Sequence, residues 1–399
     1  MGKQRSQFLG FFLATFFFLV IGLPADLLAS GQAIIEYKMP EGISAPYALR
    51  VDSKGRVWFT EKIGRKLVMF DPESASFDEH PLPKSWHGIG PSRIAVAPNG
   101  DVWFTVRRWA EEVAPTNLLG RFGVGDGKSG FEQFMLPDGV IPEALVVDKN
   151  GGVWFLNPEQ NQICNFTGKP LRSKCHTVPT INSYPREITL DGRGGVWFSE
   201  GNVDRITRFD PTTGQFEEHD VPTRFASVGA LTADDGGRIW FAEMTSNRIG
   251  AYYPDLKRFD EVDIPTGAGL PTGIVSDDKG RIWFLEYRGN KVGMFDPVAA
   301  VFKEFDIPTF NSQPGEIAMD RQRGRVWFSE SGTEAKKLGL LNIATALSQT
   351  ETIGPKAVKE KKLIDRAKQE WNILHLLLAL LVLVMAGGLI KWVTKKKAA

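Results

Sequence analysis

The segment GGVWFSEGN, residues 194–202, decides the fold because close copies of it occur seven times in the chain. In every copy a tryptophan is followed by a phenylalanine, shortly after a turn that contains glycine. The seven tryptophans follow one another at intervals of 45, 51, 43, 43, 43 and 44 residues: Trp58, Trp103, Trp154, Trp197, Trp240, Trp283 and Trp327. A period in this range indicates a repeat architecture.

Each repeat divides into four short strands. In the fourth repeat these are residues 185–191 (PREITLD), 195–200 (GVWFSE), 205–210 (RITRFD) and 216–222 (FEEHDVP). The third and fourth are joined by Asp-Pro-Thr-Thr-Gly, in which proline and glycine favour a hairpin turn. Four antiparallel strands at this period are typical of a propeller blade, so the sequence predicts an all-β, seven-bladed β-propeller over residues 34–353.

Two features predict how the blades pack and close. Neighbouring strand residues point to opposite faces, so each Trp-Phe pair offers one ring to the blade on either side. Residues 34–40 (IIEYKMP) resemble the fourth strands and are predicted to be the outer strand of the last blade, which closes the ring. Residues 348–354 (SQTETIG) are the competing candidate for that place.

The composition supports a folded protein and excludes one class of partner. Hydrophobic residues make up 42% of the chain, and its 41 glycines and 24 prolines suit a fold with many turns. Its 48 basic and 47 acidic residues nearly cancel, so no basic face for a nucleic acid is expected. We expect a monomer.

Both ends differ from the repeats. Residues 1–33 have the basic, apolar, small-residue order of a signal peptide, or of an uncleaved N-terminal anchor. A charged stalk, residues 354–370, leads to a predicted transmembrane helix, residues 371–392, and a basic tail, residues 393–399. The sequence therefore predicts a single-pass membrane protein whose propeller lies outside the cytoplasm, in the periplasm or at the cell surface.

Cys164 and Cys175 are the only cysteines and fall within one repeat. In an oxidising compartment a hairpin would place them opposite each other, and we predict a disulfide. A metal pair is the alternative, but further thiols or clustered histidines are missing from the neighbouring sequence.

The last residue of the second strand is acidic in five of the seven repeats: Glu61, Glu200, Glu243, Glu286 and Glu330. Val106 and Asn157 take this place in the other two. If these residues face the channel mouth, they form a carboxylate ring that could bind Mg²⁺ or Ca²⁺. The alternative is that each glutamate accepts hydrogen bonds from backbone amides in a nearby loop.

The residues that begin the first strands are expected at the same rim. They include Tyr47, Arg93, Glu143 and Glu187, which we predict to contact a ligand. The second repeat also carries an insertion, residues 106–120, in which Trp109 is an aromatic residue that no strand pattern requires. It could recognise a ligand, form a lid or simply anchor the loop.

Residues 271–297, PTGIVSDDKGRIWFLEYRGNKVGMFDP, show the repeat most clearly: Pro-x-x-Ile, then Gly-x-Val/Ile-Trp-Phe-x-Glu, then Asn-Arg/Lys-Ile-Gly. This pattern resembles the virginiamycin B lyase family, also called streptogramin lyases, over residues 34–353. The resemblance implies a seven-bladed propeller. For the family's lyases it implies Mg²⁺-assisted elimination that linearises streptogramin antibiotics, with histidines on the channel rim, one of them directly after a blade's first proline.

The residues expected to do that chemistry differ in this chain. The corresponding positions carry no histidine: Tyr47, Ser92, Glu143, Arg186, Gly229, Thr272 and Gly315. Of the five histidines, only His87 lies in a loop that could reach the rim. Arg186 with Glu200 has the family's catalytic spacing, so Glu200 is the candidate base for an elimination.

We therefore expect a membrane-anchored propeller that binds a small molecule or an envelope protein at its channel rim. The alternative is a divalent-metal-assisted lyase or lactonase that uses the glutamates.

Overall fold

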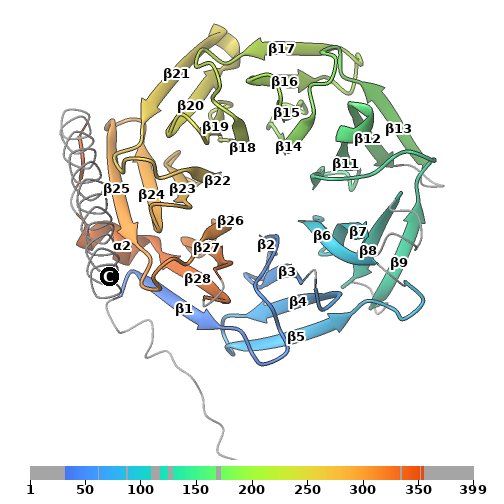
Figure 1. Cartoon of the computed structure of the whole chain (residues 1–399), viewed down its shortest axis with the longest axis horizontal. Coiled ribbons are helices and arrows are strands. Elements are labelled where there is room, and N and C mark those ends of the chain that lie inside the picture. The colour runs from blue at the N-terminus through green and yellow to red at the C-terminus, as the bar shows by residue number, and fades with distance from the viewer. Residues whose placement is uncertain are drawn as a thin grey trace, which may run out of the picture.

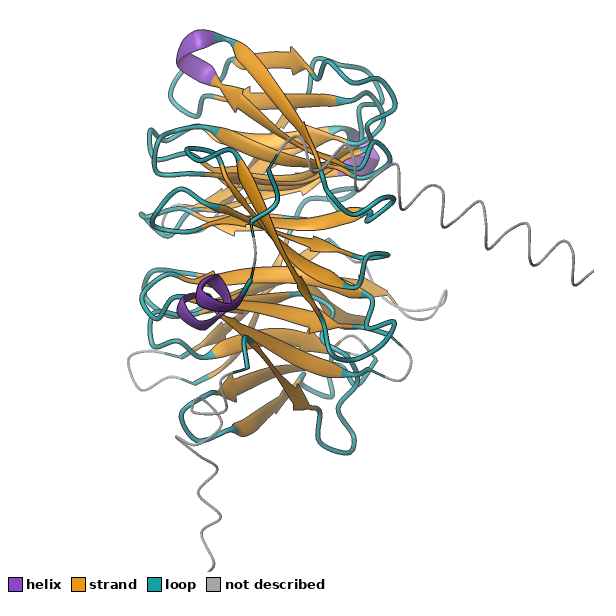
Figure 2. Cartoon of the chain, turned by 90° about the vertical axis from the view of Figure 1, so that its left-hand side faces the viewer, coloured by secondary structure: helices purple, strands orange, loops and turns teal. Residues whose placement is uncertain are grey.

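The computed structural model describes residues 32–61, 63–86, 89–108, 117–124, 129–167, 172–332, 335–350 and 352–354. They form seven four-stranded antiparallel sheets around a central channel, so the predicted seven-bladed propeller is confirmed (Figure 1). Seen from the side, the blades build a disc (Figure 2).

Each of the first six blades is one continuous stretch of chain, with its first strand at the channel. Blade 1 consists of β2 (Leu49–Val51), β3 (Val57–Glu61), β4 (Lys66–Asp71) and β5 (Ser76–Pro81); blade 2 of β6 (Ile89–Val96), β7 (Val102–Arg108), β8 (Leu118–Gly123) and β9 (Gly130–Met135); blade 3 of β10 (Leu145–Val147), β11 (Val153–Asn157), β12 (Gln162–Thr167) and β13 (Arg172–Thr177). Blade 4 consists of β14 (Pro185–Leu190), β15 (Val196–Glu200), β16 (Arg205–Phe209) and β17 (Phe216–Asp220); blade 5 of β18 (Val228–Ala233), β19 (Ile239–Glu243), β20 (Arg248–Tyr253) and β21 (Arg258–Asp263); blade 6 of β22 (Pro271–Ser276), β23 (Ile282–Glu286), β24 (Lys291–Asp296) and β25 (Val301–Asp306).

Blade 7 joins the two ends of the described chain. It contains β26 (Pro314–Asp320), β27 (Arg325–Glu330) and β28 (Lys337–Asn342), and its outer strand is β1 (Ile34–Lys38). β1 pairs with β28 from Ile34 opposite Leu341 to Lys38 opposite Lys337, which confirms the predicted closure. The competing segment instead ends helix α2 (Ile343–Gln349) and then pairs at Ile353 with Phe302 on blade 6.

The tryptophan and phenylalanine of each second strand point into different interfaces between blades, as predicted. Trp58 packs with Phe104 of blade 2, whereas Phe59 packs with Trp327 of blade 7. All these rings are buried. Replacing a buried ring by alanine typically costs about 3–5 kcal/mol, so these interfaces contribute a large part of the stability.

An aspartate at the end of the first strand orients the tryptophan. In blade 6, Asp277 accepts hydrogen bonds from the backbone N–H of Lys279 and Arg281, at 2.9 and 3.0 Å, and from Nε1 of Trp283 at 2.9 Å. The same carboxylate–indole bond forms at Asp52, Asp148, Asp191 and Asp234. A single side chain therefore closes the hairpin turn and positions the ring that contacts the next blade.

The disulfide between Cys164 and Cys175 is confirmed. The two residues lie directly opposite each other on β12 and β13, with 4.0 Å between their Cα atoms. The predicted signal segment, stalk, transmembrane helix and basic tail lie outside the described residues, apart from residues 32, 33 and 354. Among the residues that are described, no helix has the length and apolar character needed to cross a membrane.

Removing the disulfide should lower stability without changing the fold. Cys164 and Cys175 are 11 residues apart. Closing a loop of this size contributes about 3 kcal/mol in the chain-entropy model. We expect the Cys164→Ala/Cys175→Ala double variant to melt roughly 5 °C lower than the wild type. Thermal unfolding followed by circular dichroism measures this difference. A reducing agent should lower the melting temperature of the wild type to that of the variant and leave the variant unchanged.

Candidate functional site

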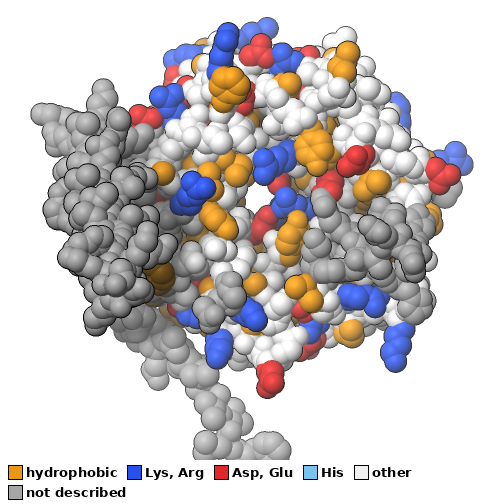
Figure 3. All heavy atoms as spheres, in the orientation of Figure 1, with side chains coloured by type: hydrophobic (Ala, Val, Ile, Leu, Met, Phe, Trp, Pro, Cys, Tyr) orange, Lys and Arg blue, Asp and Glu red, His pale blue; other side chains and the backbone are white. Residues whose placement is uncertain are grey.

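The two faces of the disc carry different loops. The mouth face carries the connections from each outer strand to the next blade and the turns between second and third strands. The connection from β1 to β2 crosses the side that faces the reader in Figure 1. The opposite, or hairpin, face carries the remaining turns. Figure 3 looks onto the mouth face, where acidic and basic side chains line a central opening and hydrophobic side chains lie around it.

Arg93 of blade 2 joins three blades across the channel mouth. Its guanidinium lies 2.9 Å from Glu187 of blade 4 and 2.5 Å from Glu316 of blade 7. Arg50 of blade 1 lies 3.4 Å from the other carboxylate oxygen of Glu316. The guanidinium of Arg93 also stacks over the ring of Tyr47, 5.8 Å from its centroid. Four blades thus meet in one network of charges, which we call the mouth network.

A backbone irregularity places the long side chains of this network in the channel. The register between first and second strands shifts between Pro91 and Ile94, and again between Pro185 and Ile188 and between Pro314 and Ile317. Such bulges redirect side chains. Arg93, Glu187 and Glu316 occupy the same place, two residues after the proline. The corresponding residues of the other four blades are small, which leaves room for Arg93: Ala48, Ala144, Ala230 and Gly273.

The surroundings of Arg93 keep it charged. Glu187 makes the largest contribution, and Glu316, Tyr47 and Glu143 add to it, so the pKa of Arg93 stays well above its ordinary value although burial opposes the charge. Four of the predicted ligand contacts, Tyr47, Arg93, Glu143 and Glu187, are therefore close in space. The fifth, Trp109, lies outside the described residues, as does His87.

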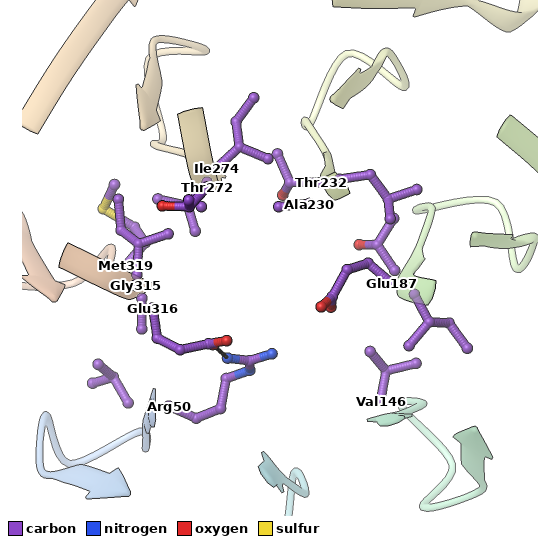
Figure 4. A pocket seen from close by; sticks show the side chains of 18 residues that line it. Arg50, Val146, Glu187, Ala230, Thr232, Thr272, Ile274, Gly315, Glu316 and Met319 are labelled. Atoms are coloured by element: carbon purple, nitrogen blue, oxygen red, sulfur yellow. Dashed lines mark hydrogen bonds and ion pairs between the residues drawn. The ribbon is translucent and has the colours of Figure 1, made fainter. Parts of the chain in front are cut away.

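A cavity of about 260 Å³ reaches from the level of Glu187 and Glu316 into the channel. Figure 4 shows Arg50 directed at Glu316, with Glu187 on the facing side. Much of the remaining lining is apolar, including Val51, Ile188, Leu231, Ile274 and Ile317. Charged groups at the opening of a partly apolar cavity are the usual chemistry of a ligand site.

The five glutamates that end the second strands do not face this channel. Each is buried, with 0–2% of its surface exposed, and the first strand separates it from the channel. Each lies directly opposite a lysine or arginine that begins the third strand. In four of the five blades, the outer-strand glutamate contacts the same cation at 2.6–3.5 Å, and in blade 4 the distance is 3.6 Å.

We call this acid–base–acid group a clamp. The five clamps are Glu61–Lys66–Glu79, Glu200–Arg205–Glu218, Glu243–Arg248–Glu261, Glu286–Lys291–Glu304 and Glu330–Lys337–Glu36.

Four clamps also hold the preceding blade through a threonine. The backbone N–H and hydroxyl of Thr180 donate to Glu218 at 3.0 and 2.7 Å. Thr223 donates to Glu261 in the same way, and Thr309 to Glu36. The backbone N–H of Thr266 donates to Glu304 at 2.8 Å. The Pro-Thr pair after these outer strands is therefore part of the contact between blades.

Blades 2 and 3 lack all three charges of the clamp together. Blade 2 has Val106, Leu118 and Gln133 at the three positions. Blade 3 has Asn157 bonded to Gln162 at 3.1 Å, and the Cys164–Cys175 disulfide takes the place of the outer-strand acid. A buried carboxylate without its cation is costly, so the charges are present or absent as a set.

The prediction that these glutamates form a carboxylate ring at the channel mouth is therefore wrong, because they lie inside the blades. The alternative, in which each glutamate accepts hydrogen bonds from backbone amides in a nearby loop, is confirmed for Glu61, which accepts hydrogen bonds from Ser44 and Gly64 and also lies beside Lys66. The described part of the chain contains no group of three or more His, Cys, Asp or Glu that could hold a metal ion. Binding of Mg²⁺ or Ca²⁺ stays a prediction.

In the part of the chain that the structure describes, no ion pair or hydrogen bond joins Arg186 to Glu200, the predicted catalytic pair. Glu200 accepts a hydrogen bond from Thr207 Oγ1 inside the blade and lies beside Arg205. Arg186 begins the first strand and packs beside Gly201 at the mouth face. The bulge after Pro185 separates the two side chains, because only the backbone of Pro185 stays in register with Glu200.

In two clamps, the carboxyl group of the second-strand glutamate stays protonated near neutral pH, where an isolated glutamate is ionised. Burial raises the pKa of Glu243 to about 8, and the neighbouring Glu261 carboxylate adds to the shift. Burial, followed by the Glu36 carboxylate, likewise raises the pKa of Glu330 to about 8. Burial also opposes the charge of Glu36, but hydrogen bonds from Lys337 and Thr309 hold its pKa below the ordinary value.

The free energy of unfolding should therefore fall as the pH rises from the ordinary pKa of glutamate, 4.5, to about 8. A carboxyl with a raised folded-state pKa favours folding fully below its unfolded value of about 4.5, and this contribution is lost as the pH rises through about 8. Relative to the wild type, the Glu243→Gln/Glu330→Gln variant should gain about 4 kcal/mol per site between pH 5 and 9, because each wild-type carboxyl keeps its proton only in the folded state over about three pH units of this interval. Urea unfolding at several pH values measures this difference. The exposed control Asp278→Asn should not reproduce it, and a constant difference between variant and wild type would contradict the assignment.

The three histidines within the described residues lie on outer strands. His80 stacks on Trp58, His176 lies against Phe209, and His219 against Trp197 and Tyr252. Burial lowers the pKa of all three. They fill the interfaces between blades.

The fold and the mouth can now be compared with known proteins. The model of the virginiamycin B lyase family matches residues 90–357. The chain belongs to this family. A streptogramin B lyase structure is 28% identical to the chain, covers 78% of it and 97% of its own length, and superposes with a TM-score of 0.67.

Two further solved structures have a similar fold. A catalytically inactive histidine-to-alanine variant of virginiamycin B lyase from Staphylococcus aureus, with quinupristin, is 25% identical, with 77% of this chain and 98% of that chain covered and a TM-score of 0.67. YCF48 from Cyanidioschyzon merolae is 12% identical, with 78% and 99% covered and a TM-score of 0.62, and shares the fold alone. No curated protein matches the chain.

The sequence analysis did not identify Arg50 as a member of the mouth network. It also did not predict the ion pair between Glu316 and Arg93. The signal was present: Arg93, Glu187 and Glu316 stand at the same place after a proline, where the other blades have alanine or glycine. Aligning the seven repeats at this position would have predicted that Arg93 meets Glu187 and Glu316.

Proposed function

We propose that this member of the virginiamycin B lyase family is a binding propeller, which takes up a ligand or partner at the mouth of its channel. The mouth network carries the proposal. It gathers Tyr47, Arg93, Glu187 and Glu316 from four blades above a partly apolar cavity, and the side chain of Arg50 keeps 38% of its surface exposed.

The contacts favour binding over histidine-dependent elimination. The described histidines fill interfaces between blades, and the mouth position after each blade's first proline carries another residue. The glutamates of the alternative mechanism face lysine or arginine inside the blades. These glutamates are buried, with 0–2% of their surfaces exposed, so neither a substrate nor a hydrated metal ion at the mouth reaches their carboxyl groups.

Binding at the mouth can be tested by thermal shift. Small molecules and peptides that raise the melting temperature of the full-length protein by about 2 °C or more should lose this effect in the Tyr47→Ala/Arg50→Ala variant, because binding to the folded state alone raises its stability. Both side chains are more than a third exposed, so the variant should fold normally. Leu256→Ser on the hairpin face serves as the matched control. Ligands that stabilise both variants equally would refute binding at the mouth.

Enzymatic activity is tested separately. With quinupristin and Mg²⁺, we expect the retention time of the antibiotic on a chromatography column to stay unchanged. Calorimetric titration with Mg²⁺ or Ca²⁺ should show no stoichiometric ion that is lost in Glu200→Gln or Glu243→Gln. Turnover, or such an ion, would favour the metal-assisted lyase or lactonase instead.

We also propose that the protein is anchored in a membrane with the propeller outside the cytoplasm. The signal-like residues 1–33 and the apolar run at residues 373–390 support this, and a disulfide suits an oxidising compartment. The full-length chain should stay in the membrane pellet after alkaline carbonate extraction, and deletion of residues 371–399 should release it. An uncleaved N-terminal anchor would instead keep the deletion variant in the pellet.

A further inference from the structure

The mouth face of blades 4–7 carries a local excess of positive charge. Its described loop residues are 181–184, 201–204, 223–227, 244–247, 266–270, 287–290, 309–313, 331–332 and 335–336. Their basic residues are Arg224, Arg288 and Lys336, and Arg186 follows at the start of β14. No ion pair joins these four to an acidic residue of the described chain, although other arginines of this half, such as Arg205 and Arg248, are paired.

The acidic residues nearby are already occupied. Asp204 is the only acidic residue of these described loops, and its two carboxylate oxygens accept hydrogen bonds from the backbone N–H groups of Phe225 and Ser227. At the ends of the outer strands, Asp220, Asp263 and Asp306 face Arg205, Arg248 and Lys291. Among the described residues of these loops, the charges that remain unpaired are therefore positive.

Apolar side chains stand between these cations. Ile181, Phe225 and Phe310 project from three of the loops that connect blades, with 83%, 85% and 92% of their surfaces exposed. Tyr184 and Val203 are also exposed on this face. On the hairpin face the exposed large hydrophobic residues are Leu256 and Val298, so the apolar tips of the described chain gather mainly at the mouth.

Phe225 is held outward at an energetic cost. Its backbone has a φ of 57°, in the left-handed region that bulky residues rarely adopt. Asp204 accepts its N–H at 2.6 Å, and the hydroxyl of Thr245 donates to its carbonyl oxygen. The corresponding residues Asn182 and Asn311 adopt the same conformation beside Ile181 and Phe310. Ala268 has the same conformation in the connection between blades 5 and 6, so the fold sets this turn and the sequence places a phenylalanine on it.

We propose that this surface, formed by Arg186, Arg224, Arg288, Ile181, Phe225 and Phe310, docks an acidic polypeptide segment that carries aromatic or aliphatic side chains. The inference rests on the proposed function, since it names the partner of the same face. The arginines, which form no ion pair within the described chain, bind the carboxylates, and the exposed apolar tips bind the hydrophobic side chains.

The same geometry favours a polypeptide over an anionic lipid surface. Asp220 and Asp306 are 76% and 87% exposed at the outer edge of this face, where a flat anionic membrane would meet them. A polypeptide segment is narrower than the disc and fits inside this acidic edge.

The test uses the purified full-length protein on an array of synthetic twelve-residue peptides of varied composition. Bound peptides should be enriched in Asp or Glu together with Phe, Leu or Ile. For the best peptide, fluorescence anisotropy should show at least a tenfold weaker affinity for Arg224→Glu/Arg288→Glu and a several-fold loss for Phe225→Ser. Circular dichroism and melting temperature confirm that the variants fold. The hairpin-face controls Lys149→Glu/Lys279→Glu and Leu256→Ser/Val298→Ser should bind like the wild type.

Each other outcome overturns the inference. Bound peptides without acidic enrichment, or unchanged affinity in Arg224→Glu/Arg288→Glu, would refute the partner chemistry. Binding to vesicles with 30% anionic lipid, without peptide binding, would assign the surface to a membrane. Loss of peptide binding only in Tyr47→Ala/Arg50→Ala would refute this inference and leave the proposed function intact. Loss only in the hairpin-face controls would refute both.

Discussion

The burial of paired aromatic rings between neighbouring blades is the constraint on which this structure depends. A four-stranded blade cannot bury both of its faces alone, and the Trp-Phe pair sends one large ring into each neighbouring interface. The ring must close, since an open end would leave one set of aromatic residues exposed. Pairing of β1 with β28 provides this closure and brings Trp327 against Phe59 of blade 1.

The clamps act within the geometry that the aromatic residues establish. An ion pair is expensive to bury, so it contributes less to net stability than to the choice of one arrangement. Each outer-strand glutamate of blades 4–7 joins a cation of its own blade to the loop of the preceding blade. The clamps thereby fix the loops that carry the mouth face. This connects a buried group of charges to the exposed surface for which we propose binding.

The side chains that line the channel are selected differently from those that pack between blades. Bulges in the first strands turn one residue per blade toward the axis, and most blades place alanine or glycine there. Where three blades place charged residues instead, the charges meet across the opening. These residues lie at the channel, outside the aromatic clusters that pack the blades together. Membership of the family establishes the propeller fold. Which ligand or reaction the propeller serves depends on the few residues at the channel mouth.

The sequence alone determined the number of blades, the four strands in each, the closing strand and the disulfide, because each depends on a local pattern repeated at a fixed period. It also placed Tyr47, Arg93, Glu143 and Glu187 at one rim. It did not show where Glu200 and Glu243 point, since that depends on a cation on the next strand and an acid on the outer strand. Only the tertiary structure decided that these glutamates lie inside the blades and that Arg93 spans the channel. Both results depend on distances between residues far apart in the chain, which strand spacing does not contain.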